Sequence, residues 1–177
     1  MKTVMPYLCI CFFVMLTGVV EGKDITSYQN LEGLRKVSKT IPMDLSLTGS
    51  EPLNLDEGQI KKIILTRLER LKVGAEDSSN VNAGFQVTVS GVTTGGGGAD
   101  ITVKLSLISR VTSPYKKDRM ISAIIWAREK QDKQAVTFDA EKKKMVNVKV
   151  SVNERIYSAV EELMGIFQDD YNKANTK

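Results

Sequence analysis

The chain lacks histidine entirely, and its only two cysteines, Cys9 and Cys11, lie near the start of its 177 residues. The absence of histidine excludes the usual Ser–His–Asp and Cys–His catalytic arrangements and most zinc sites. If the N-terminal segment is removed on export, no cysteine is left to act as a nucleophile or to form a disulfide. The sequence therefore argues against an enzyme that uses imidazole or thiolate chemistry.

Carboxylates are the remaining catalytic candidates, but their spacing forms no known motif. Asp169 and Asp170 are adjacent, so on a helix their side chains point apart. Asp132, Asp139 and Glu141 lack the spacing of a calcium loop. We therefore expect no enzymatic activity, no cofactor and no metal site. A hydrolase of cell-wall material, in which only the fold brings two carboxylates together, is an alternative.

Aromatic residues make up only 6% of the chain, and the net charge is a modest +4. Proteins that bind single-stranded nucleic acid usually interleave aromatic and basic residues. Here only Tyr115 and Trp126 lie near basic residues, which argues against nucleic acid as a partner. These two residues are instead candidate anchors on an uncovered sheet face. For Trp126 we favour packing in the core, and the surface anchor is the alternative.

The N-terminus has the composition of a secretory signal peptide over residues 1–22. Lys2 supplies a positive end, residues 7–20 are apolar, and a small residue, Gly22, precedes Lys23. We expect cleavage near Gly22 and Lys23, and a mature chain that does not span the membrane. The apolar run is shorter than the roughly 20 residues of a spanning helix, although an uncleaved anchor is an alternative. The expected location is the periplasm or exterior of a bacterium, because exported animal domains often contain disulfides.

Hydrophobic periodicity predicts the order strand, helix, strand, strand, strand, helix for the rest of the chain. Period-two alternation predicts strands within residues 41–49, 85–92, 101–111 and 120–131. In the last of these, Ile124 and Trp126 should share one face. Apolar stripes predict two helices; their members are Ile60, Ile63, Ile64, Leu68 and Leu71, then Val152, Ile156, Ala159, Val160, Leu163, Phe167 and Tyr171.

The sequence also predicts where the first helix begins and ends. Asn54 or Asp56 can cap its start, and Gly74 is a natural stop. Residues 23–39 show no clear periodicity and are expected to form a flexible N-terminal arm. Residues 40–177 should form a single α+β domain. Its expected fold is a four-stranded, mostly antiparallel sheet with both helices packed on one face.

Four consecutive glycines, Gly95, Gly96, Gly97 and Gly98, lie between two predicted strands. A phosphate-binding loop would instead place its glycines between a strand and a helix. Glycines between alternating strands reverse the chain, because they accept positive φ angles. The run therefore predicts a hairpin turn, and its four glycines are further candidates for contact with a partner.

Three segments resemble an uncharacterised group of small exported bacterial proteins: residues 53–73, the strand segment 123–131 that contains Trp126, and the tail 160–177. More loosely, the arrangement resembles envelope-assembly lipoproteins such as the lipopolysaccharide-assembly lipoprotein, although no cysteine is placed to carry a lipid. This resemblance implies an envelope protein and carries no activity with it. Our functional hypothesis is a non-enzymatic binding or assembly module that contacts another envelope protein or polymer. A carrier of a small molecule or lipid, held between helices and sheet, is an alternative.

Overall fold

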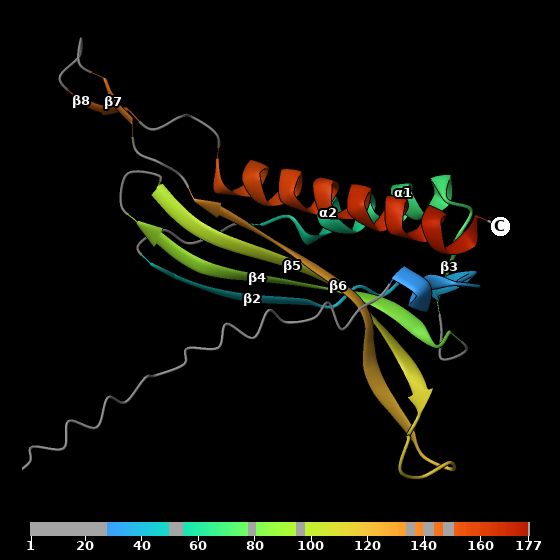
Figure 1. Ribbon diagram of the computed structural model, residues 1–177. Helices are drawn as coiled ribbons and strands as arrows, with labels where there is room; N and C mark the ends of the chain where they lie inside the picture. Colours follow the sequence, from blue (N-terminus) through green and yellow to red (C-terminus); the bar gives the residue numbers. More distant parts are fainter. Residues whose placement is uncertain are drawn as a thin grey trace, which may run out of the picture.

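A mixed β-sheet carries both helices on one of its faces (Figure 1). The computed structural model describes residues 28–49, 55–77, 81–94, 98–133, 137–139, 144–146 and 151–176. The strands β4 (Ala83–Thr94), β5 (Gly98–Thr112) and β6 (Met120–Lys133) form an antiparallel meander. Because Thr94 pairs with Gly98, the glycine run joins two antiparallel strands, as predicted. Gly95, Gly96 and Gly97 themselves lie outside the described residues.

The prediction of a four-stranded, mostly antiparallel sheet was wrong, because the main sheet has six strands and is mixed. Strand β2 (Met43–Gly49) runs parallel to β4, with a helix crossing over between them. Strand β1 (Lys36–Ser38) pairs in parallel with both β3 (Gly74–Glu76) and β4. Strands of three residues are too short to show alternation, which is why β1 and β3 left no signal in the sequence. A second, separate pair consists of β7 (Thr137–Asp139) and β8 (Lys144–Val146).

The described part of the expected N-terminal arm, residues 28–39, is packed against the domain. A short 3₁₀ helix, η1 (Tyr28–Leu31), precedes β1, and both Leu31 and Val37 are fully buried. The Tyr171 hydroxyl donates to the Leu34 carbonyl oxygen at 3.1 Å. Residues 28–39 therefore belong to the folded domain, because two apolar side chains spaced six apart can anchor a segment without producing a periodic pattern.

Helix α1 (Glu57–Arg70) begins as predicted and ends earlier than predicted. The Asp56 carboxylate accepts from the Gln59 backbone N–H at 3.2 Å, which caps the start. The end is formed by Lys72, whose φ is +58°, and not by Gly74. The backbone N–H of Val73 reaches back to the Leu68 carbonyl oxygen at 3.0 Å. Gly74 instead starts β3.

Helix α2 (Val152–Asn175) confirms the second predicted stripe. Ser151 and Glu154 form a reciprocal capping box at its start. The predicted stripe from Ile156 to Tyr171 is buried against the sheet, and Val152 is half-buried. Phe167 lies at the centre of the core, with its ring 5.0 Å from that of Phe85 and nearly perpendicular to it. Within the described residues, neither helix combines the length and apolar character needed to cross a bilayer.

A β-bulge in β6 changes the direction of the meander. Leu107 pairs with Trp126, but the next residue, Ile108, pairs with Ile124, so Ile125 is an extra residue on β6. Ile124 and Trp126 therefore lie on opposite faces, contrary to the simple alternation that we expected. The Ile125 carbonyl oxygen accepts a hydrogen bond from Asn30 Nδ2 at 3.0 Å. Strand β4 still pairs with β5 as far as Ser109; beyond that point the two strands β5 and β6 continue as a pair and project away from the helices (Figure 1).

Candidate functional site

Trp126 lies in the core and is not available as a surface anchor. Its side chain is fully buried, and its ring centroid is 5.1 Å from that of Phe167 in an edge-to-face contact. Its Nε1 donates to Asp170 Oδ2 at 3.1 Å. The bulge at Ile125 explains why the ring points toward the helices and not toward the uncovered face. Core packing, the interpretation that we favoured from the sequence, is the arrangement found.

Acidic side chains of the described residues hold α2 along β6. The side chains at positions 128, 130 and 132 of β6 lie on the face that α2 covers. They follow Trp126 in steps of two, and every second residue of a strand lies on the same face. Three ion pairs link the two elements: Arg128 with Asp170 at 3.0 Å, Lys130 with Glu162, and Arg155 with Asp132 at 2.8 Å. These carboxylates therefore stabilise the packing of α2 against β6. A hydrolase would instead need two carboxylates that face each other across a cleft.

In the Asp132–Arg155 pair, the neighbouring guanidinium shifts the pKa of the carboxyl. The hydrogen bond from Arg155 lowers the pKa of the Asp132 carboxyl below its ordinary value, against the opposing effect of partial burial. Arg155 also donates to the Ala99 carbonyl oxygen at 3.0 Å. A low pKa favours the charged carboxylate and is the opposite of what a general acid requires.

The projecting part of the meander, which we name the distal hairpin, consists of residues 108–125. Its loop is held by backbone hydrogen bonds, because the Ser113 N–H donates to the Arg119 carbonyl oxygen at 2.7 Å. The Arg119 N–H in turn donates to the Lys116 carbonyl oxygen at 3.1 Å. The Tyr115 N–H donates to Ser113 Oγ at 3.3 Å. The loop thus has a defined shape although it lies at the surface.

Three large apolar or aromatic side chains of the distal hairpin face solvent. The exposed fraction is 93% for Tyr115, 53% for Met120 and 48% for Ile124. Met120 pairs with Thr112 and Ile124 pairs with Ile108, so Met120 and Ile124 share one face of the hairpin. That face is the continuation of the sheet face that carries no helix. Tyr115 was a predicted candidate and is accessible to a partner.

A hollow of about 370 Å³ lies where the distal hairpin leaves the sheet. Its wall includes Gln86 of β4, the hairpin residues Ile108, Arg110 and Ser122, and Ser38, Thr40 and Pro42 from the segment around β1 and β2. Because Ile108 and Ile124 are cross-strand partners, the hollow adjoins the exposed apolar residues of the hairpin. Hollow and hairpin face together form one continuous surface, which we name the hairpin surface.

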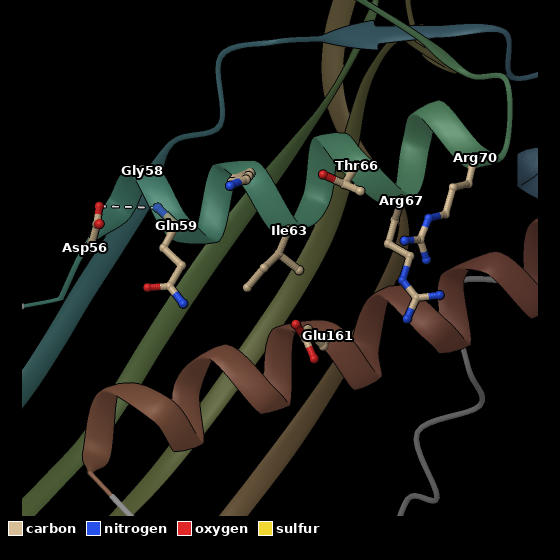
Figure 2. A pocket seen from close by; sticks show the side chains of 9 residues that line it. Asp56, Gly58, Gln59, Ile63, Thr66, Arg67, Arg70 and Glu161 are labelled. Atoms are coloured by element: carbon tan, nitrogen blue, oxygen red, sulfur yellow. Dashed lines mark hydrogen bonds between the residues drawn. The ribbon is translucent and has the colours of Figure 1, made fainter.

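A larger groove of about 610 Å³ runs between α1 and α2 (Figure 2). Ile63 and Arg67 of α1 point toward α2, where Glu161 stands on the opposite wall. Arg67 Nη1 donates to Gln168 Oε1 at 3.1 Å, which ties the two helices together. Lys62, Arg70 and Asp56 also line this groove, so it carries both signs of charge without concentrating either. In the described part of the chain, no group of three or more metal-ligating side chains gathers.

Sequence reasoning missed Met120, Ile124 and Arg110 as members of a surface. A signal existed in residues 120–126, where apolar residues occupy both alternating sets. This signal could not be interpreted without the bulge, because simple alternation places Ile124 on the same face as Trp126. The distal hairpin could not be foreseen, because the bulge that changes the direction of the meander left no recognisable signal in the sequence.

No protein-family model and no curated protein matches the chain. Similar solved structures include a PelC variant dodecamer from Paraburkholderia phytofirmans, at 10% identity and a TM-score of 0.40, covering 77% of this chain and 92% of that chain. A minor lipoprotein from Acinetobacter baumannii is 9% identical with a TM-score of 0.35, covering 80% and 93%. The rare lipoprotein B from Shewanella oneidensis is 15% identical with a TM-score of 0.25, covering 74% and 92%. These are loose likenesses of fold, and no functional conclusion is taken from them.

Proposed function

We propose that this protein is an exported, non-enzymatic envelope protein that binds a macromolecular partner through the hairpin surface. The observation that carries the proposal is the exposure of Met120 and Ile124 on one face, beside a hollow of about 370 Å³. Apolar side chains clustered on a surface commonly mark interaction sites, whereas single ones need no explanation. Export is supported by the composition of residues 1–22.

The chemistry of this surface favours a partner segment with apolar and acidic side chains. Ile124 and Met120 supply apolar contacts, and Arg110 stands between them as the partner of Ser122 in the strand register. An arginine among apolar residues is the combination found at the energetic centres of interfaces. Strands β5 and β6 already hold these side chains at regular spacing. Binding a partner therefore costs little conformational entropy.

The two alternatives have less support. A carrier would hold its ligand between helices and sheet, but Phe85, Phe167 and Trp126 are fully buried against one another in that layer. A hydrolase would need two carboxylates facing each other across a cleft. Asp132 and Asp170 are each paired with an arginine instead.

Site-specific photocrosslinking in living cells tests the proposal. A photoreactive residue at Ser122, which is exposed on the hairpin surface, should give discrete adducts. The Ile124→Glu substitution should remove these adducts, because it places a charge at the centre of the apolar contact. The matched control is Ile166→Glu, since Ile166 is exposed to a similar extent, 43%, on α2.

The outcome that contradicts the proposal is equally specific. Adducts from Ser122 that persist in the Ile124→Glu variant, or the absence of adducts altogether, would overturn binding through this surface. Release of soluble sugars or peptides from purified cell wall by the wild-type chain would overturn the non-enzymatic assignment.

A further inference from the structure

The tip of the distal hairpin differs in chemistry from the hairpin surface at its base. Residues 114–119, which form the tip, contain three cations, Lys116, Lys117 and Arg119, and one carboxylate, Asp118. Their net charge is therefore +2, and that of the whole chain is +4. Six residues thus carry half of the net positive charge of the chain, at the end of a hairpin that projects away from the helices (Figure 1).

These cations are available to a partner. All residues from Pro114 to Met120 are exposed. Among the described residues, none of these three cations takes part in an ion pair. By contrast, the basic residues on the helix-facing side of β6 are paired with carboxylates of α2. The charge of the tip is thus not used to hold the fold together.

We propose that residues 114–119 bind the surface of an anionic phospholipid membrane, with Tyr115 at the level of the headgroups and the tip cations against the lipid phosphates. Tyrosine is enriched at membrane–water interfaces, because its ring is apolar and its hydroxyl is polar. Lys and Arg near an anionic leaflet add electrostatic attraction. Tyr115 is 93% exposed and is followed directly by two lysines.

The shape of the tip favours a lipid surface over a folded protein. A stable protein interface buries about 800 Å² on each partner. Seven exposed residues on a turn form a convex projection that cannot supply this area alone. A fluid layer of headgroups, in contrast, adapts to a convex projection. The hydrogen bonds that fix the loop keep Tyr115 and the cations together before contact. This inference goes beyond the proposed function, which rests on the face of the hairpin and not on its tip.

Vesicle cosedimentation tests the proposal with the chain as purified from cells. Vesicles of phosphatidylcholine alone are compared with vesicles in which a third of the lipid is phosphatidylglycerol. Only the anionic vesicles should show binding that depends on the tip. Replacing Lys116, Lys117 and Arg119 by Gln should lower this affinity about 100-fold, at about five-fold for each cation. Replacing Lys61, Lys62 and Arg70 by Gln is the matched control, because it removes the same charge from exposed positions of α1.

Fluorescence provides a second readout that does not depend on affinity. Trp126 is the only tryptophan and is fully buried, so it should not respond to lipid. The Tyr115→Trp variant should show a blue shift with anionic vesicles, and an Ile166→Trp control should not. Circular dichroism checks that each variant is folded.

Three results would overturn the membrane proposal. The first is equal binding by the tip and α1 variants, and the second is binding to both kinds of vesicle alike. The third is binding of the tip to soluble polyglutamate without any blue shift of Tyr115→Trp on vesicles, which would indicate an acidic protein partner. Crosslinking from Ser122 is measured separately, so the proposed function can hold when the membrane contact fails, and the reverse.

Discussion

The Nε1 atom of Trp126 and the Oδ2 atom of Asp170 lie 3.1 Å apart, joining the centre of β6 to the last third of α2. Arg128 Nη2 donates to the same oxygen at 3.0 Å, and its guanidinium lies 5.8 Å from the Trp126 ring centroid. Asp170 is 8% exposed, so its carboxylate depends on these two donors, of which Arg128 also supplies the opposite charge. This network satisfies the one polar atom of a large core side chain.

Replacing Asp170 by Ala is expected to destabilise the protein by about 3 kcal/mol, because an indole N–H and a largely buried guanidinium lose their acceptor. The free energy of unfolding can be measured with urea, using the fluorescence of Trp126 as the signal. The neighbouring Asp169 is exposed, so Asp169→Ala is the matched control and should change stability by no more than about 0.5 kcal/mol. Equal effects of the two substitutions would contradict the structural role of Asp170.

The Asp132–Arg155 pair predicts a pH dependence of stability. The folded-state pKa of Asp132 lies below its unfolded-state value, so the pair contributes fully above the unfolded value, about 3.9. This contribution is lost as the pH falls from there through the folded-state pKa. The wild type should therefore exceed Asp132→Asn in stability at neutral pH, and the difference should shrink in acid.

A double-mutant cycle assigns this pH dependence to the pair. In an Arg155→Met background, Asp132→Asn should no longer change how stability depends on pH, because the hydrogen bond that lowers the pKa is gone. Urea midpoints of the four proteins at neutral and acidic pH are the measurement. A pH-dependent difference that survives in the Arg155→Met background would assign the effect to another group.

The positive φ angle of Lys72 predicts that its replacement by glycine stabilises the folded protein. Its φ of +58° places a side chain in the left-handed region that glycine adopts at the ends of helices. Lys72→Gly should raise the free energy of unfolding by about 1 kcal/mol, because the strain on Cβ disappears. The control Lys62→Gly places the same change within α1 and should lower stability by about 1 kcal/mol. A destabilising Lys72→Gly would mean that its side chain contributes more than its backbone strain costs.

Signal cleavage is a prediction from the sequence alone. Intact-mass analysis of the protein recovered from the cell envelope should show a chain that begins at or within a few residues of Lys23. Removal of residues 1–22 would also remove both cysteines, so the mature chain should not react with thiol reagents. Recovery of the full-length chain in the membrane fraction would favour the uncleaved anchor.

The sequence predicted those elements whose pattern extends over several turns or residue pairs. The stripe from Ile156 to Tyr171 located α2, and alternation located β4 and β5, because long elements repeat their signal. It missed β1 and β3, which have three residues each, and it could not give the direction of β2. The predicted end of α1 was wrong because Lys72, and not Gly74, adopts the left-handed backbone conformation that ends the helix.

The candidate site was less predictable than the fold. Tyr115 is exposed, whereas Trp126, for which we weighed a surface anchor against the favoured packing in the core, is fully buried. One inserted residue, Ile125, is enough to reverse the alternation of every position before it, and nothing in its identity announces a bulge. Ile124 was missed for the same reason. Local deviations from regular pairing therefore limit what periodicity can say about surfaces.

The exposure of all seven residues from Pro114 to Met120 has an evolutionary consequence. Substitutions there leave the free energy of folding nearly unchanged, because no core side chain depends on them. Natural selection can therefore alter what this protein meets without altering whether it folds. Orthologues should therefore retain the arginine–carboxylate pairs beneath the long helix, whereas these seven positions should vary according to the surface that each orthologue contacts.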